Sequence, residues 1–285
     1  MVLKDLFPFQ EQLNFYCFST STLLLGHSHS IYVLGSREST ANHWRAGIYD
    51  RIMNYLADGY LVAYIGEEDE SVTKEHFSRM GMQVEDSIQS GSLTIVNRDV
   101  FYSPFIPPTT LMQQWNKLFD SIKKKTSGQI SKGFIAIGMP ADSFFISALD
   151  RQQLVRYESL VAKKYDGGIE AMCLYDVGMI YQLQLGQIIA LLNAHQNTGH
   201  KEGKLKQWNN ERALALIRQG LDAALGDNVT EMVLSFIIRD FEGDEQAVVM
   251  QPDQFEKKLQ ILLGPRATDV VIDNIKKEIS KDIAF

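Results

Sequence analysis

Five short apolar runs, rich in β-branched and aromatic residues, constrain the fold of this 285-residue chain more than any other feature. A stretch with helical periodicity separates each run from the next. The runs are SIYVLG at 30–35, YLVAYIG at 60–66, SLTIVN at 92–97, GFIAIG at 133–138 and AMCLYD at 171–176. Strands that are apolar along their whole length are typical of parallel sheets buried on both faces. The pattern therefore predicts an α/β fold with a mostly parallel sheet flanked by helices.

The end of the chain has a different pattern, in which apolar residues recur at helical spacing. Four such segments are bounded by glycine, proline or capping residues, at about 214–225, 228–237, 252–263 and 268–279. Four short amphipathic helices predict a small all-α bundle.

Periodicity fails between these two parts, where glycine and lysine accumulate. We therefore expect an α/β domain over residues 1–200, a linker over 201–210 and a helical domain over 211–285.

Charge and composition disfavour several classes of function. The net charge is −7, and residues 211–285 carry 9 Lys/Arg against 14 Asp/Glu, so we expect no nucleic-acid partner. The sequence has no apolar run of about 18 residues and no secretory layout at its start, so we expect a cytoplasmic protein with no membrane contact. Cys17 and Cys173 belong to no Cys-x-x-Cys pair, which predicts neither a disulfide framework nor a structural zinc.

Polar residues follow the predicted strands at the carboxyl edge of the sheet, where open parallel sheets bind ligands. The candidate ligand-binding residues at this edge are Ser36, Arg37, Glu38, Glu67, Met139 and Asp176. Asp176 has an alternative interpretation as the cap of the following helix. The motifs of α/β hydrolases, zinc proteases and dinucleotide enzymes are absent from the sequence, so we assign no catalytic residue.

Histidines raise the question of a metal site. His27 and His29 alternate at the start of the first strand, and His195 or Glu67 would have to supply a third ligand. Two ligands do not make a site, so we assign no metal. We expect His195, which lies where periodicity is lost, to be exposed to solvent.

A second polar group is expected near the fifth strand. Tyr157 and Glu158 together with Cys173, Tyr175 and Asp176 are candidates for a buried polar cluster. Because Cys173 lies in the middle of an apolar run, we interpret it as a core residue rather than a sensor thiol.

The first two strands and their loops resemble the RecA/KaiC group of P-loop ATPases. A working phosphate loop needs G-x-x-x-x-G-K-[ST], but residues 35–42 are GSRESTAN, without the second glycine and the lysine. Glu67 and Glu68 resemble the acidic pair with which KaiC-like ATPases activate water. A degenerate ATPase that binds nucleotide weakly through Arg37 and Glu67 is therefore one alternative.

Residues from about 20 to 200 resemble the MEDS domain, a KaiC-like sensory fold without a functional phosphate loop. The matching pieces are His27, His29, DGYLVAYI at 58–65, GSLTI at 91–95, Tyr102, GFI at 133–135, Tyr157-Glu158, CLYD at 173–176 and His195. This resemblance implies a sensory function and adds Tyr102 and His195 to the candidate ligand-binding residues.

The last 75 residues resemble the Nitrosopumilus output domain, described mainly from ammonia-oxidising archaea. The matching pieces are Gly220-Leu221, Leu225-Gly226, PDQFE at 252–256 and LLG at 262–264. Together the two resemblances imply a sensor that binds a small ligand, such as a hydrocarbon derivative, and signals to a protein partner through its helical domain. An assembly scaffold with a vestigial pocket is a further alternative. The sequence leaves open the ligand, any cofactor, the partner and whether the chain forms homo-oligomers.

Overall fold

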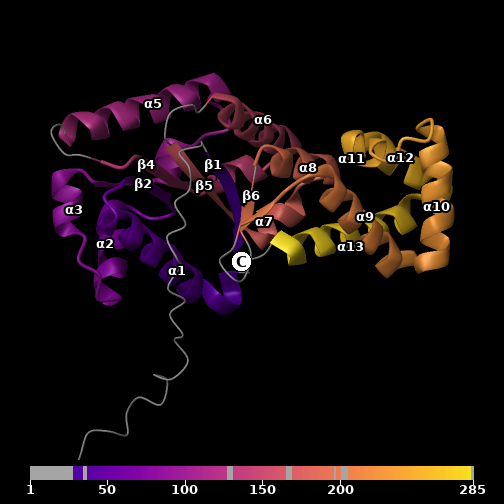
Figure 1. Ribbon diagram of the computed structural model, residues 1–285, viewed down its shortest axis with the longest axis horizontal. Helices are drawn as coiled ribbons and strands as arrows, with labels where there is room; N and C mark the ends of the chain where they lie inside the picture. Colours follow the sequence, from indigo (N-terminus) through magenta and orange to yellow (C-terminus); the bar gives the residue numbers. More distant parts are fainter. Residues whose placement is uncertain are drawn as a thin grey trace, which may run out of the picture.

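The computed structural model describes residues 28–34, 37–126, 131–164, 169–195, 197–199 and 205–283, which form a helix-covered sheet followed by a group of helices (Figure 1). Within these residues the sheet has seven strands in the order β3-β2-β4-β5-β1-β6-β7. The strands are β1 (Ser28–Leu34), β2 (Leu61–Gly66), β3 (Leu93–Asn97), β4 (Phe134–Gly138), β5 (Ile169–Asp176), β6 (Asn197–Gly199) and β7 (Leu205–Gln207).

The five apolar runs are strands β1 to β5, and all of their pairings are parallel, which confirms the predicted sheet. β2 is buried at all six positions, as expected for a central strand covered on both faces. The sheet continues past β1, where β6 pairs in parallel and β7 pairs antiparallel to β6. The linker predicted over 201–210 remains a prediction, since residues 201–204 lie outside the described part of the chain.

Alternating side chains of the strands enter two separate cores. Ile31 and Val33 in β1 face one core, while Tyr32 and Leu34 face the other. The second core is covered by α1 (Arg37–Ala57), α2 (Glu70–Arg79) and α3 (Glu85–Ser90). The first is covered by α5 (Pro108–Lys125), α6 (Ala148–Lys164) and α8 (Leu185–Asn193). Short elements connect these layers, namely α4 (Arg98–Phe101), the 3-10 helix η1 (Asp142–Phe145) and α7 (Val177–Gln182).

The predicted C-terminal helices are present, which confirms the helical part of the fold. They are α9 (Asn210–Leu225), α10 (Asp227–Asp240), α12 (Pro252–Leu263) and α13 (Pro265–Ile283), with a short α11 (Ala247–Met250) in addition. The side chain of Asn209 caps α9 by accepting a hydrogen bond from the backbone N–H of Arg212 at 2.9 Å. None of the described helices is long and apolar enough to cross a membrane.

The helical segment packs on the end of the sheet at which α7 and α8 lie (Figure 1). α12 contacts α8, and α13 contacts both α7 and β1. The contact with α8 is close, since a Cβ atom at Gly186 would lie 2.6 Å from Oδ1 of Asp253. One continuous apolar core therefore runs from the α5–α6–α8 face of the sheet into the C-terminal helices.

Candidate functional site

The residues predicted at the carboxyl edge of the sheet do not gather into one site. Ser36 lies outside the described residues, and Arg37 and Glu38 open α1, where their side chains are not described. Met139 is buried in the core beneath α1 and α2. Asp176 caps α7, because its Oδ1 accepts a hydrogen bond from the backbone N–H of Gly178 at 2.6 Å. This contact agrees with the alternative interpretation of Asp176 as a helix cap.

Glu67 belongs to a network of ion pairs at the same edge. One of its carboxylate oxygens lies 3.3 Å from Arg45, and the other lies 3.3 Å from Arg98. Arg45 is also 3.3 Å from Glu68, whose carboxylate is 2.9 Å from Nδ1 of His76. Cationic partners within the chain therefore hold both members of the acidic pair.

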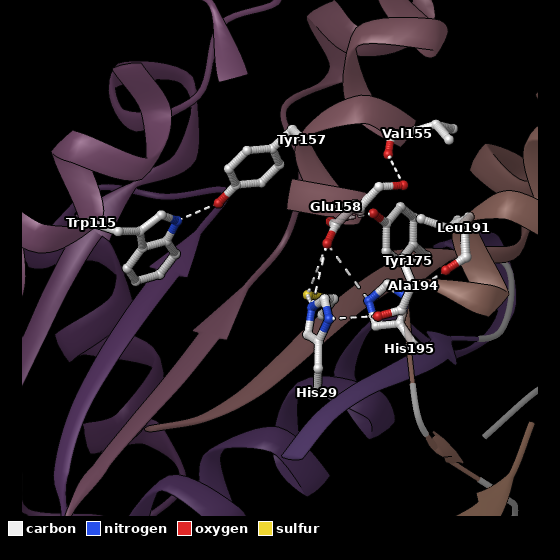
Figure 2. A network of polar contacts seen from close by, with 11 residues as sticks. His29, Trp115, Val155, Tyr157, Glu158, Tyr175, Leu191, Ala194 and His195 are labelled. Atoms are coloured by element: carbon white, nitrogen blue, oxygen red, sulfur yellow. Dashed lines mark hydrogen bonds and ion pairs between the residues drawn. The ribbon is translucent and has the colours of Figure 1, made fainter. Parts of the chain in front are cut away.

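A second polar cluster lies under α6 and α8, at the amino-terminal half of β1 (Figure 2). We call His29, Glu158, Cys173 and His195 the His–Glu–Cys cluster. Oε2 of Glu158 is 3.4 Å from Nε2 of His29, 3.7 Å from Nε2 of His195 and 3.7 Å from Sγ of Cys173. Nε2 of His29 lies 3.2 Å from the same sulfur atom. The two imidazole rings lie side by side, with their centroids 4.0 Å apart.

The strand register explains why residues so distant in sequence meet here. β1 and β5 are parallel neighbours, with His29 opposite Ala171, and alternate residues of a strand point to the same face. His29 and Cys173 therefore both face α6, which supplies Glu158. His195 follows Ala194, the C-cap of α8, and its backbone N–H donates to the carbonyl of Leu192 at 3.0 Å.

The hydrogen bonds of the cluster fix which atoms carry protons. Nδ1 of His29 lies 2.9 Å from the carbonyl oxygen of Ala194, and Nδ1 of His195 lies 2.7 Å from that of Leu191. A carbonyl only accepts, so each Nδ1 is the protonated, donating nitrogen. Each Nε2 then faces Glu158, whose other oxygen accepts a hydrogen bond from the Tyr175 hydroxyl at 2.6 Å.

Burial and neighbouring charges shift the ionisation of these groups in different directions. Burial alone would raise the pKa of Glu158, but the contacts with His29 and His195 and the hydrogen bond from the Tyr175 hydroxyl together lower it. Burial and then the Glu158 charge raise the pKa of the Cys173 thiol well above its usual value. Burial and then His29 lower the pKa of His195 to about 3. The cluster therefore consists of a carboxylate, a thiol and a neutral His195 beside His29.

The expectation that His195 is exposed was wrong, because its side chain is only 1% exposed. The predicted contacts of Glu158 with Cys173 and Tyr175 are present, whereas Tyr157 accepts a hydrogen bond from the indole N–H of Trp115 (Figure 2). Sequence reasoning missed that His29 and His195 join this group. A signal was available, since all four cluster residues lie in the pieces through which the sequence resembles the MEDS domain.

An apolar cavity of about 30 Å³ adjoins the cluster, between α5, α6 and the strands β4 and β5. We call it the α5–α6 cavity. Its apolar wall includes Tyr102, Trp115, Phe119, Leu154, Tyr157 and Val161. Glu158 and Cys173 form its polar end, so two cluster residues also line the cavity. Tyr102, which the family resemblance singled out, is thus a cavity residue.

A glycine shapes the wall of this cavity. A Cβ atom at Gly138 would lie only 2.7 Å from the hydroxyl oxygen of Tyr102. The absence of a side chain at the end of β4 therefore leaves room for the Tyr102 hydroxyl.

The fold and the cavity together define an α/β protein with an internal cavity beside a buried polar cluster. A model of the MEDS family, the MEthanogen/methylotroph, DcmR Sensory domain, matches residues 37–196, and the chain belongs to this family. The match contains Glu158, Cys173 and His195, whereas His29 precedes it. The family is a sensory one, as the sequence resemblance implied. Among curated proteins, no match to the chain was found.

Proposed function

We propose that this protein is a non-catalytic cytoplasmic sensor that binds a small, weakly polar molecule in the α5–α6 cavity. The single observation that carries the proposal is the composition of the cavity wall. Aromatic and aliphatic side chains surround it, while Glu158 and Cys173 place hydrogen-bonding groups at one end, a combination typical of small-molecule sites. A cavity of about 30 Å³ suits a molecule of few heavy atoms, since one water needs about 10–15 Å³ on the same measure.

The helical domain, residues 211–285, is the output half of this proposal, in keeping with its resemblance to the Nitrosopumilus output domain. α6 carries Glu158, and α8 leads into His195, so a ligand that shifts either helix also shifts the close contact of Gly186 with Asp253 on α12. Tight packing transmits such shifts because cores are nearly incompressible.

One face of α10 supports binding of a protein partner. Val229, Met232 and Phe236 recur at helical spacing and are 43%, 63% and 46% exposed. α10 lies at the end of the molecule far from the sheet (Figure 1). A partner bound there would read out the helical domain without covering the cavity.

The test compares two identical substitutions on neighbouring strands. Ala136 in β4 lines the cavity, whereas Ala63, its register partner in β2, is buried outside the cavity lining. The measurement is the thermal shift of the full chain with methanol, ethanol and dichloromethane, together with native mass spectrometry of the freshly purified protein. We expect Ala136→Val to abolish the shift by filling the cavity, and Ala63→Val to retain it at a lower melting temperature.

The alternatives predict other results. ATP turnover that disappears in Glu67→Gln would contradict the sensor and favour the degenerate ATPase. An empty pocket with no thermal shift would favour the scaffold. A shift that survives unchanged in Ala136→Val would place the binding site outside the α5–α6 cavity.

A further inference from the structure

We propose that the His–Glu–Cys cluster binds one divalent transition-metal ion of the zinc type. His29, Glu158, Cys173 and His195 supply two imidazole nitrogens, a carboxylate oxygen and a thiolate sulfur. One ligand atom from each of the four lies within 4.8 Å of all the others. The site shares Glu158 and Cys173 with the lining of the α5–α6 cavity, but the inference rests on the ligand atoms of the cluster and not on the apolar wall.

The distances between the ligand atoms match a tetrahedral site. Zinc bonds of about 2.0–2.3 Å to nitrogen, oxygen and sulfur place neighbouring tetrahedral ligand atoms about 3.3–3.8 Å apart. The four separations given above, 3.4, 3.7, 3.7 and 3.2 Å, fall at or close to this range. The other two pairs of ligand atoms lie within 4.8 Å of each other, so small movements of the side chains would bring all four to the spacing of a tetrahedral ion.

The partners behind the ligand atoms also match those of metal sites. Metal-binding histidines commonly donate their second ring N–H to a carbonyl, which fixes the tautomer and leaves the other nitrogen available to the ion. Both histidines make this contact, with Ala194 and Leu191. The Tyr175 hydroxyl holds one oxygen of Glu158 and thereby directs the other toward the histidines and the sulfur.

An unsatisfied buried atom points to the same conclusion. Nε2 of His195 is buried and has no hydrogen-bond partner among the described residues. Buried polar atoms in proteins almost always have a partner, so an orphaned nitrogen aimed into a cluster of ligand groups requires an explanation. A metal ion would use its lone pair.

Charge balance favours a divalent ion. When Cys173 binds, its proton leaves for solvent, and the resulting thiolate and the Glu158 carboxylate together carry two negative charges. An M²⁺ ion neutralises both, so a buried site of this composition has no net charge.

The nitrogen and sulfur donors select zinc-type ions over Mg²⁺ and Ca²⁺, which prefer oxygen ligands. Four protein ligands saturate such an ion as in structural zinc sites.

The experiment titrates the chelator-treated full-length chain with Co²⁺, which reports sulfur and tetrahedral coordination by absorption. We expect saturation at one Co²⁺ per chain, with a sulfur-to-cobalt charge-transfer band that stoichiometric Zn²⁺ abolishes and Mg²⁺ does not. Cys173→Ser should lose the charge-transfer band, while Cys17→Ser, which changes the other cysteine of the chain, should keep it. His76→Asn should also keep the band, since His76 lies in α2, outside the cluster.

The metal content of the untreated protein provides a second measurement, which does not require removing the metal and adding it back. We expect about one zinc per chain after expression with added zinc, a loss of at least tenfold in His195→Gln, and no change in Ala136→Val, which alters only the cavity. Absence of both stoichiometric zinc and a Co²⁺ charge-transfer band in the wild-type chain would overturn the proposal. A cobalt spectrum that is unchanged in Cys173→Ser would overturn it as well. Because Ala136→Val tests the cavity alone, failure of the sensor proposal can be distinguished from failure of this one.

Discussion

Two glutamates on opposite faces of the sheet have pKa values shifted in opposite directions. Glu158 has imidazole and phenol partners on the α6 face, and these lower its pKa despite burial. Glu170 in β5 packs toward the other face, where it accepts a hydrogen bond from the Tyr55 hydroxyl at 3.1 Å. Burial raises the pKa of Glu170, and Tyr55 and Arg51 only partly offset that effect. The number of cationic or donating partners, and not depth alone, decides the direction of the shift.

Replacement of Glu170 tests this difference. A carboxyl whose pKa is raised by folding binds its proton more tightly in the folded state, so its contribution to stability falls as pH rises from its unfolded pKa of about 4.3. Glu170→Gln keeps an acceptor for Tyr55 without the charge. We expect the variant to be more stable than the wild type at pH 7, with the difference shrinking toward pH 4. Urea unfolding at both pH values measures it, and a difference that is constant with pH would contradict the argument.

At the scale of elements, the closest packing occurs where α9 crosses α13. A Cβ atom at Gly220 would lie 2.4 Å from Cα and 2.6 Å from the backbone nitrogen of Ile275. Backbone atoms cannot move aside as a flexible side chain can. Gly220 is therefore required for the approach of the two helices and not for an unusual backbone angle.

Gly220→Ala should destabilise the protein even though alanine favours helices. The gain in helix propensity is about 1 kcal/mol, but separating two helices to relieve the overlap costs more. We expect a net loss of about 1–3 kcal/mol, the usual cost of overpacking. Gln219→Ala, at the exposed neighbouring position in α9, is the matched control and should change stability by less than about 0.5 kcal/mol. Urea midpoints decide between these outcomes, and a Gly220→Ala variant more stable than the wild type would refute the prediction.

Elements were predictable from the sequence because their signals are local. The apolar runs at 60–66 and 133–138 mark β2 and β4 without knowledge of their neighbours. β6 and β7 escaped prediction because each has three residues and lacks an apolar pattern. Their place in the sheet depends on pairing with β1, which is a long-range contact.

The candidate site was less predictable for the same reason. Glu158, Cys173 and Tyr175 were grouped correctly, since they lie within 17 residues of each other. His29 joins them only because β1 lies next to β5, a contact across 144 residues in sequence. Nothing in the periodicity around residue 195 indicates that a turn after α8 is buried against that pair.

At the scale of the whole molecule, the sheet and the helical segment share one core. Ile188 in α8 and Phe255 in α12 are both fully buried in the same apolar cluster, and the amino group of Lys276 in α13 donates to the carbonyl of Tyr181 at 3.3 Å. A segment that depends on a shared core loses much of its stabilisation when its neighbour unfolds. This coupling is also what a relay from cavity to output helices requires.

We therefore predict that both parts unfold in a single transition. Trp115 in α5 and Trp208 before α9 are both buried. Trp115 reports on the α/β part, whereas Trp208, whose indole N–H donates to Asn193 at 2.9 Å, reports on the junction between α8 and α9. In a Trp44→Phe background, further substitution of Trp208 or Trp115 by Phe leaves one reporter on either side. For each single-tryptophan chain, urea unfolding is followed by fluorescence and by circular dichroism. We expect the two midpoints of each chain to agree. Two resolved transitions, with the Trp208 signal changing separately, would instead show that residues 211–285 fold independently, so that a ligand bound near Glu158 would have no rigid path to α10.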